Sequence, residues 1–139
     1  MKISKYLDLK QVSHSQTAIR KKIDNTPENE HLDNIKHTAS FFDIIFDQFN
    51  GKLRLSSFYR GKKLNTAVGG SKTSQHMTGE AMDIQAINGV TNADIYRYIK
   101  DNLNFDQLIW EYGTSKEPAW VHVSFKANGK NRKQILKIG

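Results

Sequence analysis

The longest regular hydrophobic pattern lies in the segment that runs from Pro27 to Phe49. Apolar residues recur there at intervals of three and four positions, the spacing of one face of an α-helix. They are Leu32, Ile35, Ala39, Phe42, Ile45, Phe46 and Phe49. Thr26 stands before Pro27 as a helix cap would, and Asn50-Gly51 follows as a stop. The pattern therefore predicts one long helix that begins at Pro27 and ends before Asn50.

Two shorter helices are predicted on either side of the long one. Ser15 is a suitable N-cap for a helix that stops before Asn25. The segment 91–102 also begins with a capping threonine, and its apolar residues share one side. Residues 1–14 are expected to form an irregular or short-strand arm, and residues 60–75 a loop with room for a short helix.

Strands are predicted after the long helix, where apolar and polar residues alternate. The segments are KLRLSSFY (52–59), EAMDIQA (80–86), FDQLIWEY (105–112), WVHVSFK (120–126) and KQILKIG (133–139). The chain thus has helices first and then strands, with one helix inserted among the strands. This order is typical of an α+β fold with a largely antiparallel sheet. We expect one domain, residues 1–139, in which N-terminal helices pack on a small sheet, since this length suits a single core.

Composition and charge narrow the classes of partner. The chain has no cysteine, which excludes disulfides and thiolate ligands and leaves His, Asp and Glu as metal ligands. A net charge of +7 favours an anionic partner, such as a cell-wall polymer or a nucleic acid. Nucleic acid ranks last because no Lys/Arg cluster is interleaved with aromatics. No apolar run approaches the ~18 residues of a membrane span.

Three residues stand out as candidate metal ligands. Strand alternation places His122 on the face opposite Val121 and Val123, and it places Asp83 away from its apolar neighbours. His76 precedes the strand that holds Asp83. Two imidazoles and one carboxylate leave a fourth position for water, as in catalytic zinc sites. The other interpretation of this stretch is an ordinary turn into a strand. The remaining histidines, His14, His31 and His37, are interpreted as surface or boundary residues.

Several ordered motifs resemble peptidase family M15, the zinc D-alanyl-D-alanine carboxypeptidases, and most closely its subgroup in phage lysins and bacterial cell-wall enzymes. The central motif is matched by Ser74, His76, Gly79, Ala81 and Asp83. The second histidine of the family is matched by His122 in WVHVS. An upstream element is matched by SSFYR and Leu64-Asn65, with Phe58 where glycine is usual. The resemblance covers most of the chain.

The resemblance implies roles for these residues. His76, Asp83 and His122 would bind one Zn²⁺, Arg60 would hold a substrate carboxylate, and Ser74 would help to position the substrate. Family members use an acidic or histidine base near the second histidine ligand. Some have an acid three positions before it, where this chain has Ala119. Glu111 is therefore the preferred general base and Glu117 its competitor, and strand register decides whether Glu111 faces the site.

The function that the resemblance implies is a zinc peptidase that hydrolyses amide bonds in peptidoglycan stem peptides. Carboxypeptidase and endopeptidase activities both remain open. The alternative is a catalytically inert cell-wall-binding module of the same fold. Because no apolar signal segment is present, we expect synthesis in the cytoplasm. Action on the wall would then follow holin-type release, as for a phage or prophage lysin.

Overall fold

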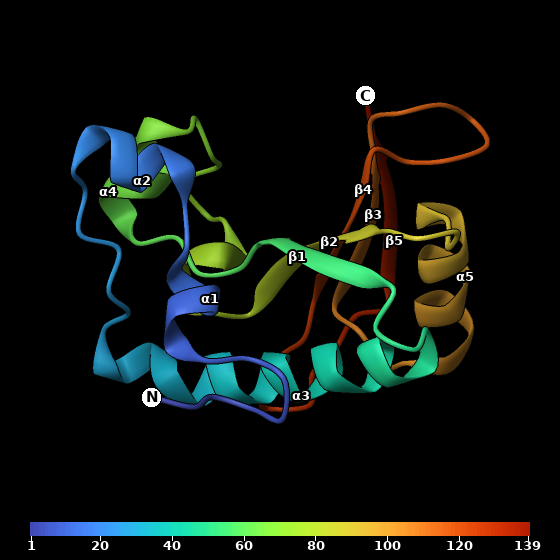
Figure 1. Ribbon diagram of the computed structural model, residues 1–139, viewed down its shortest axis with the longest axis horizontal. Helices are drawn as coiled ribbons and strands as arrows, with labels where there is room; N and C mark the ends of the chain where they lie inside the picture. The colour runs from blue at the N-terminus through green and yellow to red at the C-terminus, as the bar shows by residue number, and fades with distance from the viewer.

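Five strands form one mixed sheet in the computed structural model, which describes residues 1–139 (Figure 1). The strands are β1 (Leu53–Ser57), β2 (Ala81–Ala86), β3 (Gln107–Glu111), β4 (Trp120–Ser124) and β5 (Gln134–Ile138). Their order in the sheet is β1-β2-β4-β3-β5. Neighbours are antiparallel except β3 and β5, which run parallel. The predicted α+β fold with a largely antiparallel sheet is therefore confirmed.

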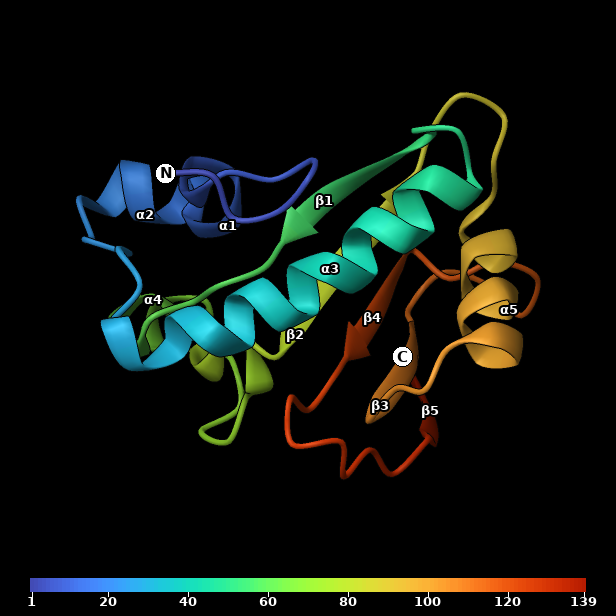
Figure 2. The ribbon, with the colours of Figure 1, turned by 90° about the horizontal axis from the view of Figure 1, so that it is seen from below.

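The two faces of the sheet differ in chemistry. Apolar side chains of β2, β3 and β4 project to one face and are fully buried; they are Met82, Ile84, Leu108, Val121 and Val123. The helices α3 (Leu32–Gln48) and α5 (Asn92–Asn102) contribute Ile35, Ile45, Ile95 and Ile99 to the same core. Figure 2 shows α3 crossing the sheet and α5 beside it. Each such buried side chain stabilises the fold by about 1.5–3 kcal/mol. Because this face supplies the core, polar residues on the opposite face do not disrupt it.

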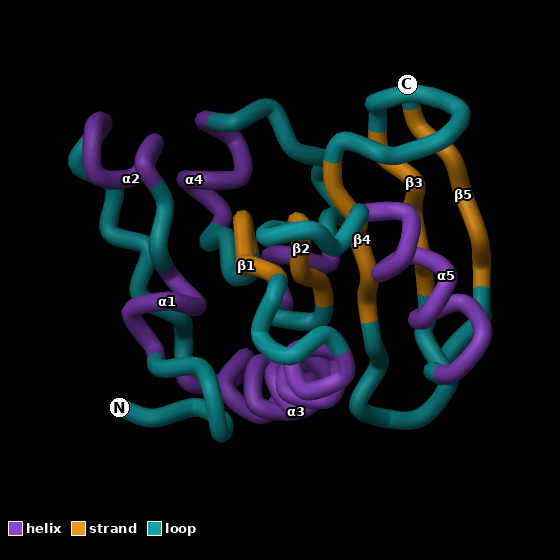
Figure 3. Tube along the Cα trace, turned by 45° about the vertical axis from the view of Figure 1, so that its right-hand side comes forward, coloured by secondary structure: helices purple, strands orange, loops and turns teal.

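Four short helical segments lie near one end of the sheet. They are α1 (Leu9–Ser13), α2 (Gln16–Lys21), α4 (Lys62–Ala67) and the 3-10 turn η2 (Gln75–Thr78). Figure 3 shows α1, α2 and α4 on the side of β1, with α5 on the other side. Ser15 caps α2 as predicted, because its Oγ accepts a hydrogen bond from Ala18 N at 3.2 Å.

The expectation of an irregular arm over residues 1–14 is wrong for α1. The Asp8 carboxylate accepts a hydrogen bond from Gln11 N at 2.9 Å, and the Gln11 side chain accepts one from Asp8 N at 2.8 Å. This reciprocal capping box supports a helix that has a single buried residue, Val12. The apolar pattern of so short a helix is too sparse to show in the sequence.

The long helix begins at Leu32, after a 3-10 turn η1 (Asn29–His31), rather than at Pro27. The cause is the buried side chain of Asn25. Its Nδ2 donates to Ser13 O at 2.9 Å and to Tyr59 O at 3.0 Å, and its Oδ1 accepts from Gly61 N at 2.7 Å. These contacts hold the chain before Glu28 in an extended path, so Thr26 does not cap the helix.

Candidate metal centre

Three side chains from separate elements converge on the polar face of the sheet. His76 comes from η2, Asp83 from β2 and His122 from β4, and their ligand atoms all lie within 4.8 Å of one another. Asp83 lies opposite His122 in the register of β2 and β4, so both project to one face. His76 Nε2 lies 3.3 Å from Asp83 Oδ2, and His122 Nδ1 lies 3.0 Å from Asp83 Oδ1. The structure thus brings together the three predicted metal ligands, His76, Asp83 and His122, which we call the metal cluster.

The turn that carries His76 is fixed at both ends by its neighbours in the motif. Ser74 Oγ accepts a hydrogen bond from His76 N at 3.2 Å and begins the turn. Gly79 ends it with a φ of +79°, a conformation that favours glycine. A Cβ at Gly79 would lie 2.4 Å from Ile35 Cγ1, so α3 packs against this glycine. Ala81, fully buried, then begins the strand that carries Asp83.

The orientation of the His76 ring follows from its second nitrogen. Nδ1 lies 2.6 Å from Phe58 O, and only 2 % of the residue is exposed. A carbonyl oxygen can only accept, so Nδ1 donates to it, and Nε2 is the nitrogen directed at Asp83. Metal-bound histidines are oriented in this way in known sites.

The electrostatics of the cluster favour an ionised carboxylate. Burial opposes ionisation of Asp83, but the adjacent imidazoles of His76 and His122 outweigh it and hold the pKa of Asp83 well below its usual range. The donor set is therefore two imidazole nitrogens and one carboxylate oxygen. Three such protein ligands, with a position left open, are the set that catalytic zinc sites use. The residues present fit such a metal.

Glu111 lies beside this cluster. Ile109 pairs with His122 and Glu111 with Trp120 in the register of β3 and β4, so Glu111 and His122 share one face. The indole Nε1 of Trp120 donates a hydrogen bond to Glu111 Oε2. Burial raises the pKa of Glu111, and the negative charge of Asp83 raises it further. Glu111 is therefore a weaker acid than an exposed glutamate, although the hydrogen bond from Trp120 partly offsets this effect.

The competing acid, Glu117, lies elsewhere. Its Oε1 accepts a hydrogen bond from Asn92 N at 2.8 Å, at the start of α5. The cavity beside the metal cluster has a volume of about 620 Å³, and Glu111 lines it whereas Glu117 does not. Of the two acids left open by the sequence, the structure brings only Glu111 to the cluster.

Arg60 and Ser74 line the same cavity. Arg60 Nη2 donates to Ser74 Oγ at 3.4 Å, and Arg60 N donates to His76 O at 3.1 Å. The Nε of Arg60 is buried and has no hydrogen-bond partner within the chain. Burial lowers the pKa of Arg60, while Asp83 and Glu111 counter this effect. Arg60 therefore lines the cavity next to the cluster, and the donor that it leaves unused lies beneath the surface.

Comparison with known proteins identifies the family. The model of the family described as Peptidase M15 matches residues 5–124. The chain belongs to the peptidase M15 family. Among solved structures, this M15 chain is similar to the LdcB LD-carboxypeptidase, whose structure is described as revealing the molecular basis of peptidoglycan recognition. The two chains are 21 % identical; the match covers 77 % of this chain and 63 % of that one, with a TM-score of 0.39. No curated protein matches the chain.

One buried network of this M15 chain escaped the sequence-based prediction. Asp106 is fully buried and accepts hydrogen bonds from Arg132 Nε and Nη2, each at 2.9 Å, and from Gln75 Nε2 at 2.8 Å. Gln75 adjoins His76, so the network anchors the turn that carries a candidate ligand. Asp106, at the start of an otherwise apolar predicted strand, indicates a buried polar contact. Its partner Arg132 lies 26 residues away, so no local pattern identifies it.

Proposed function

We propose that this chain is a zinc-dependent peptidase that hydrolyses amide bonds in peptidoglycan stem peptides. The observation that carries the proposal is the convergence of His76, Asp83 and His122 within 4.8 Å, in one cavity with Glu111. Membership of the peptidase M15 family, matched over residues 5–124, supports a hydrolytic use of this arrangement.

Each residue has a role in this proposal. Zinc held by His76, Asp83 and His122 would supply polarisation of a water molecule and of the amide carbonyl. Glu111 accepts a proton from the attacking water and returns it to the leaving nitrogen, a role that a raised pKa suits. Arg60 binds a substrate carboxylate through its planar guanidinium, and Ser74 holds Arg60 in place.

The substrate and site of action are part of the proposal. Peptidoglycan stem peptides have the free carboxylates that Arg60 would bind, and an anionic wall polymer would attract a chain with a net charge of +7. Carboxypeptidase and endopeptidase cleavage are both compatible with the cavity. We propose action on the cell wall, as by a phage lysin released through a holin. None of the helices combines the length and apolarity needed to cross a membrane.

The first test is the metal content of protein purified without added metal. Elemental analysis of the wild type is expected to give about one zinc per chain, and His122→Ala is expected to lose it. His37→Ala, which changes a histidine outside the cluster, is the matched control and should retain the zinc. Wild-type protein that binds no zinc when zinc is offered would contradict the proposal.

The second test separates catalysis from binding. Glu111→Gln is expected to retain zinc and to lose hydrolysis of stem peptides by about 10²–10⁴-fold, the usual contribution of general base catalysis. Glu117→Gln is the control, since Glu117 bonds the first residue of α5 and does not line the cavity, and it should remain active. If zinc-loaded wild type binds cell walls but cleaves no wall peptide, the chain is the inert wall-binding module instead.

A further inference from the structure

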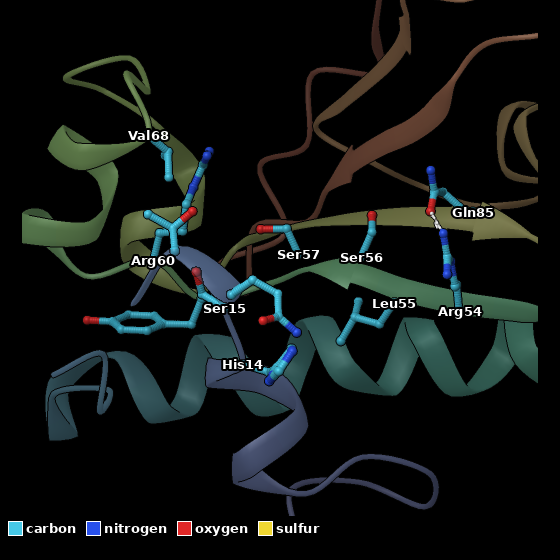
Figure 4. Close-up of a pocket in the computed structure, with 12 residues that line it drawn as sticks. His14, Ser15, Arg54, Leu55, Ser56, Ser57, Arg60, Val68 and Gln85 are labelled. Carbon is cyan, nitrogen blue, oxygen red and sulfur yellow. Dashed lines mark hydrogen bonds between the residues drawn. The ribbon is translucent and has the colours of Figure 1, made fainter. Parts of the chain in front are cut away.

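A second cavity adjoins the one that holds the metal cluster. It has a volume of about 400 Å³ and lies between the start of α2 and the edge strand β1. Arg60 and Val68 line both cavities, so the two are adjacent. Figure 4 shows Arg60 at one end of this second cavity and Arg54 at the other, with Ser56 and Ser57 between them. We call it the β1 cavity.

The lining of the β1 cavity is cationic and polar. No aspartate or glutamate lines it, and its basic residues are His14, Arg54 and Arg60. Neither arginine forms an ion pair with a carboxylate of the chain, since the ion pairs involve other cations. Asp83 and Glu111 act on Arg60 only from beyond salt-bridge distance. Two guanidinium groups in a cavity that no acidic residue lines are suited to an anionic ligand.

Arg54 is held in position for such a ligand. Its Nε and Nη2 both donate to Gln85 Oε1, at 3.0 and 2.7 Å (Figure 4). Gln85 is itself fixed, because its Nε2 donates to Ala119 O at 3.3 Å. A neutral amide oxygen uses only part of the donor capacity of a guanidinium, so both N–H groups of Nη1 are left for another acceptor.

The position of Arg54 relative to the metal cluster indicates the kind of ligand. Arg54 pairs with Gln85, and Ser57 pairs with Asp83, in the register of β1 and β2. Gln85 is two residues beyond Asp83 on the same face of β2, which is about 7 Å along the strand. An extended peptide also advances about 7 Å in two residues, so a peptide that reaches the cluster can place a side chain at Arg54.

We propose that the β1 cavity binds the continuation of an acidic peptide substrate, and that Arg54 pairs with a carboxylate about two residues from the scissile bond. The inference rests on the proposed function, because it takes the metal cluster as the site of cleavage. It makes Arg54 a specificity-determining residue for stem peptides that carry an internal acid in addition to the carboxylate held by Arg60.

The test compares two synthetic stem peptides that differ only in this internal group, a carboxylate in one and a carboxamide in the other. Binding is measured by calorimetry on zinc-loaded Glu111→Gln protein, and hydrolysis on the wild type. We expect the carboxylate peptide to bind about tenfold more tightly and to show a kcat/KM about tenfold higher. Arg54→Gln should bring both ratios close to one, chiefly by weakening binding and hydrolysis of the carboxylate peptide.

Control variants separate this effect from general loss of charge or fold. Arg97→Gln removes an exposed arginine on α5 that pairs with Asp94, and it should keep the tenfold preference. Arg54→Lys keeps the charge without the planar fork and should keep part of it. Thermal unfolding of Arg54→Gln should match the wild type, because Arg54 is exposed and its bonds to Gln85 are replaceable by water.

The outcomes are distinguishable. A preference that persists in Arg54→Gln, or its absence in the wild type, overturns this inference whether or not the peptides are cleaved. Absence of cleavage with an Arg54-dependent difference in affinity would overturn the proposed function and keep the β1 cavity as an acidic-peptide site. Equal binding of both peptides together with Arg54-dependent binding of inorganic phosphate would assign the cavity to a phosphate-bearing ligand instead.

Discussion

Gly79 offers the sharpest test of how the fold positions the metal cluster, because it lies between His76 and Asp83 and is buried against α3. Gly79→Ala introduces two penalties. A φ of +79° costs a residue with a Cβ about 1–2 kcal/mol. The new methyl group would also lie 2.4 Å from Ile35 Cγ1 and 3.3 Å from His31 O, and overpacking of this kind costs about 1–3 kcal/mol.

The total expected loss of unfolding free energy is therefore about 2–5 kcal/mol. The surroundings cannot relax easily, since Thr38 Oγ1 donates to Gly79 O at 2.9 Å and α3 is part of the core. Any relaxation displaces the end of η2 from the start of β2, so the affinity for zinc should fall as well. Urea denaturation measures the first effect and titration with a competing chelator the second.

Gly129 supplies a matched control. Its φ is also +79°, but nothing lies within 4 Å of the position a Cβ would take. Gly129→Ala should therefore cost only the backbone strain, about 1–2 kcal/mol, and leave the affinity for zinc unchanged. If Gly79→Ala destabilises the protein no more than Gly129→Ala does, then α3 does not clamp the turn and the reasoning is refuted.

Further predictions concern Arg132, which supports the candidate site through Asp106 and Gln75, and Trp120, which lines it. Arg132→Met should lower the unfolding free energy by about 2 kcal/mol at pH 7, because it leaves the buried Asp106 carboxylate without two donors. Lys100→Met, on the surface of α5, is the control, and equal urea midpoints for the two variants would contradict the prediction. The Arg132 hydrogen bonds hold the pKa of Asp106 below its usual value. Their contribution to the unfolding free energy is therefore present above about pH 4 and is lost as the pH falls. Between pH 5 and 3, urea denaturation should show a smaller loss of stability for Arg132→Met than for the wild type. Trp120→Phe removes the indole N–H donor, which favours the charged form of Glu111, so the pKa of Glu111 should rise. The acid limb of the pH profile of kcat/KM should then move to higher pH than in the wild type. An unmoved limb would count against Glu111 as the base.

Strand alternation predicted the two halves of the site that lie on β2 and β4. It assigned Asp83 and His122 to polar faces, and the structure places them directly opposite each other. Alternation predicts which side chains of a strand share a face, but it does not predict which strands are neighbours in the sheet. The order β1-β2-β4-β3-β5 puts β4 between β2 and β3, and no local pattern encodes that choice. For Glu111, alternation likewise left the register with β4 undetermined, which only the paired strands resolve.

The helix boundaries were less predictable because contacts distant in sequence override local preferences. Thr26 and Pro27 form an acceptable helix start by local chemistry, yet the side chain of Asn25 holds this segment to Tyr59 and Gly61. This amide satisfies three backbone groups in a buried position, and such hydrogen bonds favour the extended path because an unpaired buried group is costly. The helix therefore begins later, at Leu32.

Contacts between residues distant in sequence also hold the metal cluster in place. His76 lies on a short turn, whereas Asp83 and His122 lie on paired strands, so the turn is the part of the site that depends most on outside contacts. Two of the contacts that supply this support are the packing of Gly79 against α3 and the hydrogen bond from Gln75 to Asp106. Arg132, which completes the second contact, lies beyond the residues 5–124 that the family model matches. The candidate ligands lie within the matched residues, but the support of the turn depends in part on Arg132, which lies outside them.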